Sequence, residues 1–526
     1  MVQDLVHHGS NHAPLTPRGL GQKSLLVLVS TWTGNLLGML IAVLVARRLG
    51  PEAVGALGVG VGLAGIAMAL VLPGFAQAHV KRLAEGQDAG RCLGTMLTLH
   101  AVVLVVAMPL VIAADATLGT RRTGNVWAVF VMLLMAQFAT RVADVYLSVF
   151  LVREWIVEHA AIVVAARIAR LVVTAAVLAW APTVTIVAAT FVIDGVVSAV
   201  AAGVVLLVRH GIRGRPPTAA MFRTYWTYAR PLLVTNPLAI FQDSIDRVIV
   251  GRFGGLAAAG YYHIARALWE MLASVMAAPA MFLFTRLSAM YARRDPSSVD
   301  DARRFFFGAL DKLLFVSIPL AIVLWTLADA VIRLLYGAAF TPATIALRIF
   351  VVTTIAANVI NPYTHILYAR DEVGRFVPVN VARVLVYLPT LVALVIADAA
   401  GALPGTGDGA TGAAMSRLVL MVFPAWMYFR WTREIAGIGL YRRVWLYAGG
   451  FVAAVAVDRA VHAVLDGIGM PPVTTPVAAA AALGAYIGLM LAAHPEAGAN
   501  LAYARSLVSP VRVWNSLPWR RRDSLE

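Results

Sequence analysis

Long apolar runs separated by short polar breaks recur along the chain from about residue 24 to residue 493. Each run is close to or above the ~20 mainly apolar residues that a helix needs to cross a bilayer. The pattern predicts spanning helices at 24–46, 54–76, 92–113, 126–150, 157–180, 184–208, 231–250, 262–288, 310–330, 345–369, 376–397, 411–430, 444–465 and 475–493. We therefore expect an all-α integral membrane protein with about fourteen transmembrane helices.

Composition agrees with this pattern and narrows the chemistry. Of the 526 residues, 60% are hydrophobic and 13% are charged, whereas soluble domains average ~25% charged residues. Cys92 is the sole cysteine, which rules out an intramolecular disulfide and a cysteine metal cluster. The sequence contains no P-loop, H-E-x-x-H or G-x-S-x-G motif. We expect no catalytic residue, cofactor or metal, and hence a protein that is not an enzyme.

The basic residues are distributed by membrane side. The net charge is +16, and most lysines and arginines outside the spans fall in the two tails and in alternate loops. The opposite side carries Arg47, Arg48, Arg121, Arg122, Arg252 and Arg333. By the positive-inside rule, both termini are predicted to be cytoplasmic. Because the charges form no single patch, nucleic acid is not an expected partner. The longest loops, 209–230 and 289–309, are basic and leave no room for a catalytic domain.

A short glycine-containing segment occurs twice. The first copy, 47–55, joins the first two apolar runs, and the second, 250–262, joins the seventh and eighth. One constant offset superimposes Arg47 on Arg252, Gly50 on Gly255 and Gly55 on Gly260. Two explanations remain open: duplication of a six-helix unit, as in transporters built of two parallel repeats, or a glycine-rich outer turn used twice.

Duplication predicts the following domain organisation. It comprises a cytoplasmic tail (1–23), a six-helix lobe (24–208), a cytoplasmic linker (209–230), a second six-helix lobe (231–430), a helix pair (431–493) and a basic cytoplasmic tail (494–526).

Charged residues within the predicted spans are candidates for function. A charge at the bilayer centre costs about 2.5–3.5 kcal/mol on insertion scales, so it usually faces a bundle interior or an aqueous cavity. Arg141 and Asp144 share a helical face and can pair. Arg167 and Arg170 have no acid beside them, while Asp194 lies at a similar depth of about 14 Å. Two interpretations remain open: a structural salt-bridge network, or a cationic site for a phosphate-bearing substrate.

The second half of the chain has more closely balanced charges. Asp243 with Arg247, and Arg266 with Glu270, are spaced for pairing within one helix, and Asp246 lies beside them. All five lie in the outer halves of their spans. They are predicted either to neutralise one another between neighbouring helices or to form an outer gate whose ion pairs break and reform.

Four further arginines lie within or near spans. Arg383, with Asn380 nearby, is deeper and is a candidate substrate contact. Arg286, Arg348 and Arg417 lie near span ends, where their side chains are expected to extend to the membrane surface.

Two motifs resemble a known family. Residues 46–55, A-R-R-L-G-P-E-A-V-G, are similar to the A-R-x-L-G-P-x-x-x-G that follows the first helix of polysaccharide (Wzx-type) flippases. Residues 246–251 and 259–262 resemble that family's D-R-x-x-x-G…G-Y-Y. These flippases belong to the multidrug/oligosaccharidyl-lipid/polysaccharide exporter superfamily, and the overall pattern covers about 24–430.

The resemblance implies two six-helix lobes around a cavity that opens alternately to each side. It implies that the cargo is an undecaprenyl-diphosphate-linked oligosaccharide for exopolysaccharide, capsule or O-antigen assembly. The implied location is the bacterial inner membrane, and the partners are membrane lipids and the pathway's polymerase and chain-length proteins. No catalytic residue carries over from the family.

We predict that Arg141, Arg167, Arg170 and Arg383 contact the substrate. A cation-coupled multidrug exporter of the same superfamily remains an alternative, although cationic drugs would favour an acidic cavity. A membrane-embedded glycan polymerase or ligase is a further alternative, although such enzymes generally work through larger periplasmic loops than this chain has.

Overall fold

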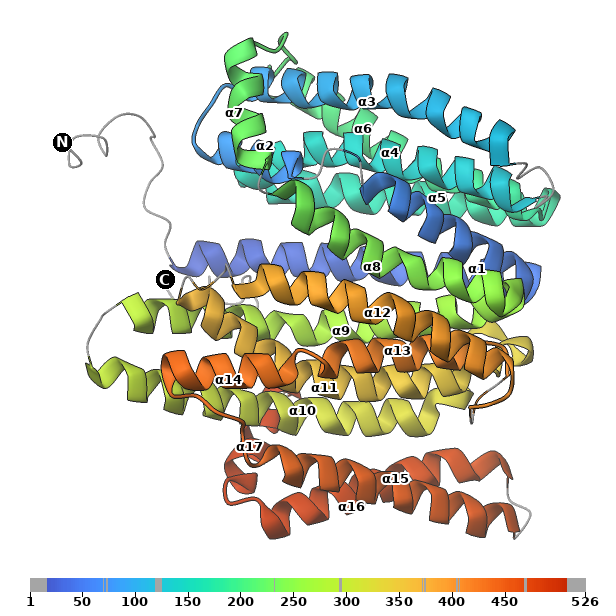
Figure 1. The fold of residues 1–526 in the computed structure, drawn as a ribbon, viewed down its shortest axis with the longest axis vertical. Coiled ribbons are helices and arrows are strands. Elements are labelled where there is room, and N and C mark those ends of the chain that lie inside the picture. The colour runs from blue at the N-terminus through green and yellow to red at the C-terminus, as the bar shows by residue number, and fades with distance from the viewer. Residues whose placement is uncertain are drawn as a thin grey trace, which may run out of the picture.

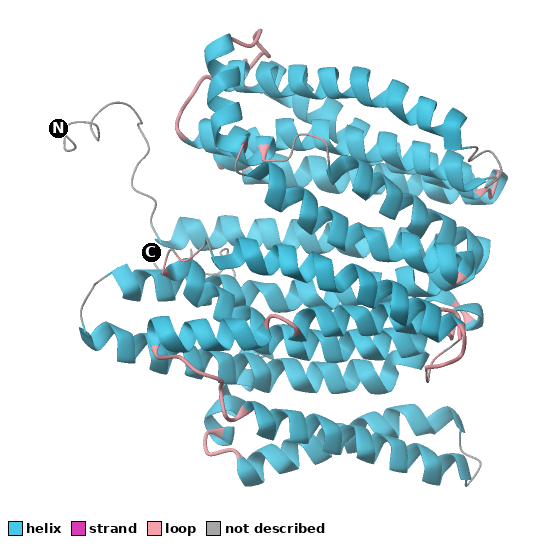
Figure 2. Ribbon diagram, in the orientation of Figure 1, coloured by secondary structure: helices cyan, strands magenta, loops and turns pink. Residues whose placement is uncertain are grey.

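The computed structural model describes residues 17–69, 74–118, 125–230, 232–292, 296–370, 375–403, 407–467 and 471–508, with a few single positions between them. Within these ranges every regular element is a helix and no strand occurs (Figures 1 and 2). Eleven of the described helical segments are long and apolar enough to cross a membrane. The prediction of an all-α, multi-pass membrane protein is therefore confirmed.

The helices fall into three consecutive groups. The first group is α1 (Pro17–Ala69), α2 (Phe75–Ala84), α3 (Ala89–Leu118), α4 (Asn125–Val152), α5 (Ile156–Trp180), α6 (Val184–Val208) and α7 (Ala219–Ala229). The second group is α8 (Leu232–Phe253), α9 (Gly255–Ala292), α10 (Pro296–Tyr336), η2 (Ala338–Phe340), α11 (Ala343–Ala369), α12 (Phe376–Ala399), α13 (Ala410–Val422) and α14 (Ala425–Ala436). The terminal helices are α15 (Val444–Gly467), α16 (Pro471–Ala493) and α17 (Ala497–Val508).

The predicted spans and the observed helices agree in place but differ in number. The predicted span 24–46 and most of the span 54–76 fall on α1, which ends at Ala69 and is continuous except for a kink at Gly50. The spans 231–250 and 262–288 fall on α8 and α9, which are not among the eleven segments. The total of fourteen therefore remains a prediction.

Two segments expected to be loops are mainly helical. The predicted loop 289–309 is wrong, because α9 continues to Ala292 and α10 begins at Pro296. The reason is an apolar position at every fourth residue: Ala302 and Phe306, which precede the predicted span, and Leu310, which begins it, are fully buried. Likewise the linker 209–230 contains α7, whose Tyr225 is buried and hydrogen-bonds to the His79 ring at 2.9 Å.

Three apolar cores hold the helix groups together. One lies beneath α2, α3, α4, α6 and α7. A second joins α10, α11 and α14 to α15 and α16, which form the outermost layer in Figure 1. The largest core contains residues of α1 and α4 together with residues of α8 to α13, so it spans both main groups.

The repeated glycine segments meet within this largest core. Gly50 (φ 78°) and Gly255 (φ 89°), which the offset superimposes, both adopt the left-handed conformation that glycine tolerates. A Cβ atom on Gly55 would lie 1.7 Å from the Leu256 carbonyl oxygen, and one on Gly260 would lie 2.2 Å from the Pro51 carbonyl oxygen.

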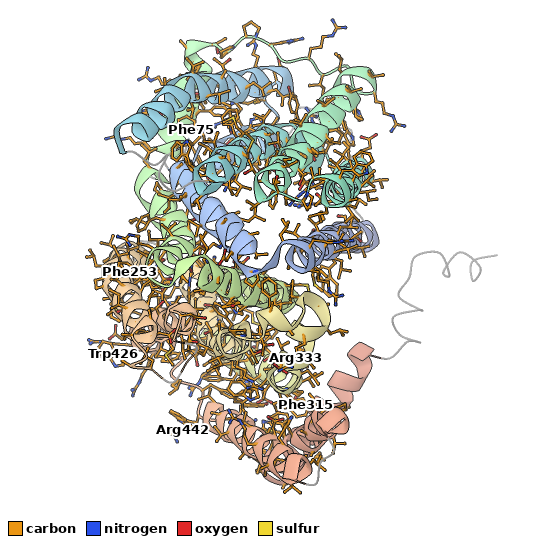
Figure 3. All side chains as sticks on the ribbon, turned by 90° about the vertical axis from the view of Figure 1, so that its right-hand side faces the viewer. Phe75, Phe253, Phe315, Arg333, Trp426 and Arg442 are labelled. Carbon is orange, nitrogen blue, oxygen red and sulfur yellow. The ribbon has the colours of Figure 1, made fainter. Side chains whose placement is uncertain are left out.

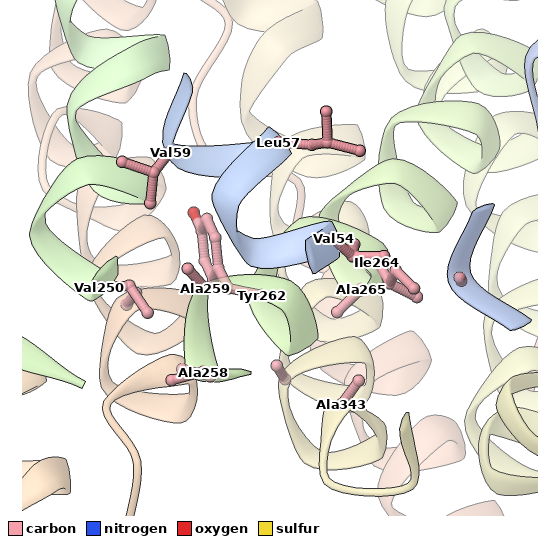
Figure 4. Packing of buried hydrophobic residues seen from close by; sticks show 14 of the residues in the cluster. Val54, Leu57, Val59, Val250, Ala258, Ala259, Tyr262, Ile264, Ala265 and Ala343 are labelled. Carbon is pink, nitrogen blue, oxygen red and sulfur yellow. The ribbon is translucent and has the colours of Figure 1, made fainter. Parts of the chain in front are cut away.

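These two contacts are equivalent, because the offset that superimposes Gly55 on Gly260 also superimposes Pro51 on Leu256. Figure 4 shows the surrounding packing, with Val54 of α1 close to Ile264 of α9. Positive φ angles at the equivalent glycines Gly50 and Gly255, together with the reciprocal contacts, favour duplication over a turn used twice.

We predict that Gly55→Ala or Gly260→Ala destabilises the protein, because the added methyl group meets backbone atoms that cannot move aside. Overpacking of this kind costs about 1–3 kcal/mol or more. The matched control is Gly449→Ala, at a helical position in α15 with open space around it, where alanine is expected to be neutral or stabilising. Thermal unfolding of the detergent-solubilised variants measures this. Equal midpoints for all three variants would contradict the close backbone contacts at Gly55 and Gly260.

Candidate functional site

Two arginines of α5 share one carboxylate of α6. The Arg167 Nη1 atom lies 2.7 Å from Asp194 Oδ2, and the Arg170 Nη1 atom lies 3.5 Å from the same oxygen. A Thr174–Thr190 hydrogen bond of 3.0 Å fixes the same two helices one turn further along. The predicted match in depth between Arg167 and Asp194 therefore corresponds to a direct contact.

This carboxylate does not neutralise both arginines. The Arg170 guanidinium is buried, stacks on the Phe191 ring at 3.5 Å, and leaves its Nε atom without a hydrogen-bond partner among the described residues. The Arg167 side chain remains 36% exposed. The α5–α6 pair therefore carries one surplus positive charge, and Arg167 is the part of it that remains accessible.

Arg167 reaches a cavity between the two main helix groups. The cavity has a volume of about 290 Å³ and is lined by α1, α5, α9 and α10. On α1 the wall includes Gly34, Asn35 and Gly38, and across from Arg167 the second group contributes Glu270. Ligand pockets for small molecules start at about 300 Å³. In this conformation the cavity therefore has room for a small polar group, such as a phosphate, and not for a saccharide chain.

The second helix group contains a compact cluster around Asp246. This carboxylate has no exposed surface and accepts hydrogen bonds from Arg266 Nη1 at 2.7 Å and Arg417 Nη2 at 2.6 Å. The Tyr262 hydroxyl donates a third hydrogen bond to it. A buried carboxylate of this kind is stable only because its partners surround it.

The rim of the cluster holds the remaining charges. Asp243, whose side chain is 66% exposed, accepts a hydrogen bond from Arg417 Nη1 at 2.9 Å. Glu270 accepts one from Arg266 Nε at 2.6 Å and lies 3.6 Å from Arg247. Three arginines thus face three acids, so this cluster is neutral, in contrast to the α5–α6 pair.

The expected pairings hold only in part. The Arg266–Glu270 pair forms as the sequence predicts. Asp243 pairs with Arg417 and, at 3.8 Å, with Arg266, whereas no ion pair joins it to Arg247 within the described residues.

The prediction that Arg417 extends to the membrane surface is wrong. Its side chain is only 4% exposed, because it completes the cluster with Asp246, which lies 171 residues away in sequence. One signal in the sequence could have identified it. The predicted cluster of Asp243, Asp246 and Glu270 with Arg247 and Arg266 lacks one positive charge, and Arg417 supplies it.

Two other candidates lie apart from these clusters. Arg141 and Asp144 are both exposed on α4, and no ion pair within 4 Å joins them in the structure as described. Arg383 lies on α12, where its side chain hydrogen-bonds to Tyr428 of α14. Neither Arg141 nor Arg383 contacts Arg167 or Arg170 among the described residues, so the predicted substrate contacts do not converge in this conformation.

A further polar cluster was not predicted. Asp311 of α10 is buried and accepts hydrogen bonds from Tyr447 at 2.9 Å, His494 at 3.0 Å, Asn500 at 2.6 Å and the Tyr441 hydroxyl. It was overlooked because it lies at the start of the predicted span 310–330, where a charged residue marks a boundary. The cluster attaches the terminal helices to the second group. No set of three or more metal-ligating side chains occurs in the described ranges.

Solved structures with the same fold are transporters. The "Lipid II flippase MurJ, inward closed conformation" matches with a TM-score of 0.66 and 11% identity, covering 92% of this chain and all of that one. The "Inward-facing conformation of a multidrug resistance MATE family transporter of the MOP superfamily" matches with a TM-score of 0.60 and 16% identity, covering 77% of this chain and 94% of that one. A MOP superfamily transporter from Pyrococcus furiosus matches with a TM-score of 0.55 and 16% identity, over 80% of this chain and 96% of its own.

Sequence comparison identifies the family. No curated protein matches the chain. A family profile described as "Polysaccharide biosynthesis protein" matches residues 20–290, more than half of the chain. The resemblance read from residues 46–55 and 246–262 is thereby confirmed. The chain belongs to the polysaccharide biosynthesis protein family and has the fold of the MOP superfamily transporters.

Proposed function

We propose that this protein is a flippase that moves an undecaprenyl-diphosphate-linked oligosaccharide from the cytoplasmic to the periplasmic leaflet of the bacterial inner membrane. The main support for this proposal is the surplus positive charge on α5. Arg167 and Arg170 share Asp194, and Arg167 lines the cavity between the helix groups. A diphosphate would supply the missing negative charge, and the guanidinium fork matches its oxygen geometry.

We propose that the two main helix groups act as lobes that rock against each other during transport. Glu270, across the cavity from Arg167, belongs to the neutral cluster and leaves Arg167 available to the substrate. On this scheme the cavity enlarges as the lobes separate, and Arg141 and Arg383 then line it with Arg167. The neutral cluster around Asp246 holds the second lobe rigid while the first lobe carries the charge.

The surplus arginine charge gives less support to the two alternative functions, a multidrug exporter and a glycan polymerase or ligase. A multidrug exporter for cationic compounds needs surplus acid in its cavity, whereas the charge here is surplus arginine. A polymerase or ligase needs a reactive constellation, and neither cluster presents a nucleophile paired with a base. Assembly proteins of the glycan pathway, including a polymerase and chain-length proteins, are the partners that this function would require.

We predict that Arg167→Ala with Arg170→Ala lowers the rate of lipid-linked oligosaccharide translocation by about tenfold or more, because charge-assisted hydrogen bonds to the diphosphate are lost. Reconstituted proteoliposomes with a fluorescent lipid-linked oligosaccharide measure the rate. Replacement of both arginines by lysine keeps the charge but removes the fork, and is expected to restore part of the rate.

The matched control is Arg48→Ala with Arg223→Ala, which removes two exposed arginines elsewhere. Its rate should equal that of the unchanged protein. Unaltered translocation in the correctly inserted Arg167/Arg170 variant would rule out the proposed role of these arginines. Export of cationic drugs in place of the glycolipid would favour the exporter alternative.

We predict that Asp246→Asn destabilises the protein strongly, because it leaves Arg266 and Arg417 buried without their shared counter-charge. Breaking a buried ion pair on one side costs about 3–5 kcal/mol. Asp243→Asn, three residues earlier on the same helix and largely exposed, should cost about 1 kcal/mol or less. Thermal unfolding midpoints of the two variants test this contrast, and similar midpoints would refute the structural role given to Asp246.

A further inference from the structure

A second and larger cavity lies away from the contact between the helix groups. Its volume is about 1070 Å³, and it lies between residues 303–311 of α10, the helix α14 and the loop that leads into α15. Six arginines line it: Arg303, Arg304, Arg430, Arg433, Arg442 and Arg443. We call this cavity the arginine pocket. All six arginines fall in segments predicted to be cytoplasmic.

The pocket has few negative charges of its own. Its two acidic residues are Asp311 and Glu496. The four side-chain donors described above already occupy Asp311, and Glu496 lies 3.3 Å from Arg443. Among the described residues no acid lies within 4 Å of Arg303, Arg433 or Arg442, whereas Arg304 and Arg430 pair with Asp301 and Glu434 on their own helices. The pocket therefore has a strong excess of positive charge.

The positive-inside rule accounts for the side on which these arginines lie but not for their convergence. They come from three separate segments, which fold around one hollow because the Asp311 cluster joins α10 to the loop before α15. Part of the wall of the hollow is aromatic, since Phe307 and Tyr441 both line it and their ring centroids stack 5.4 Å apart. A solvated charged loop would have neither the concave shape nor the stacked aromatic wall.

The edge of the pocket is apolar. Trp426 on α14 is 67% exposed, with the Arg430 guanidinium over its ring at 5.6 Å, and Leu440 is exposed on the loop that lines the pocket. In Figure 3, Trp426 and Arg442 project from the same side of the molecule. Exposed tryptophan is typical of the level of the lipid headgroups.

An apolar path leads from this edge along the bundle. Val419 and Val422 of α13, Phe423 in the turn that follows, and Trp426 of α14 are all exposed. A ligand with a phosphate in the pocket can therefore lay its hydrocarbon chains along this path. A soluble phosphate would use only the arginines.

We propose that the arginine pocket binds the phosphate headgroup of an anionic phospholipid of the cytoplasmic leaflet, at a site separate from the cavity that contains Arg167. Basic pockets between transmembrane helices on this side of the membrane suit anionic headgroups, and arginine forms bidentate hydrogen bonds with phosphate oxygens. The site does not depend on the transported substrate.

The test is lipid retention by the full chain, measured by native mass spectrometry after purification with equal amounts of phosphatidylglycerol and phosphatidylcholine. We expect preferential retention of phosphatidylglycerol. Arg433→Ala with Arg442→Ala should weaken this retention by about tenfold, because these two arginines have no acid partner to replace the phosphate. Their exposure on the surface means that the fold is preserved, and a thermal unfolding midpoint checks this.

The matched control is Arg213→Ala with Arg223→Ala, which removes two arginines on the same predicted side, outside the pocket. It should retain phosphatidylglycerol like the unchanged protein. Equal weakening in both double variants, or no preference for phosphatidylglycerol over phosphatidylcholine, would overturn the proposal. A parallel arm adds pyrophosphate without lipid: binding that matches the lipid in strength and is lost in the same variant would assign the pocket to soluble anions instead.

Discussion

Every ionisable side chain deep in this bundle must find its counter-charge within the protein, because lipid provides none. The cluster around Asp246 in the second helix group satisfies this constraint. Asp246 is enclosed by Arg266 and Arg417, and the rim residues Asp243 and Glu270 balance the remaining charge. The first group does not: Asp194 serves both Arg167 and Arg170. We propose that this imbalance, at the contact between the groups, marks a place for an anionic ligand.

Sequence reasoning recovered the fold because hydropathy is a local property. Twenty-residue apolar runs reveal spanning helices whatever their partners. Helix ends such as those near 292 and 296, and the short helices α2 and α7, escaped prediction. The extension of α10 was missed because Ala302, Phe306 and Leu310 form an apolar stripe among charged residues, and such a stripe has low average hydropathy.

The site was less accessible to sequence reasoning because its contacts are remote in sequence. Matching depth on adjacent helices correctly suggested that Asp194 lies near Arg167. Position along a single span could not show that Arg417 turns inward, since that depends on how α13 packs against α8. Only the missing positive charge in the predicted cluster of three acids and two arginines could have suggested that Arg417 is buried there. Asp311 shows the same limitation: its donors come from segments that follow it by more than a hundred residues.

The reciprocal contact of Gly55 and Gly260 bears on how such a chain can change over evolutionary time. For a protein that arose by duplication, most positions of the two halves are free to diverge independently. Where Gly55 and Gly260 meet they are not free, because a side chain on either glycine would collide with the backbone of the other half. Residues common to both halves are therefore expected to persist where the halves touch. An ancestor with only one half would have formed a dimer through this contact.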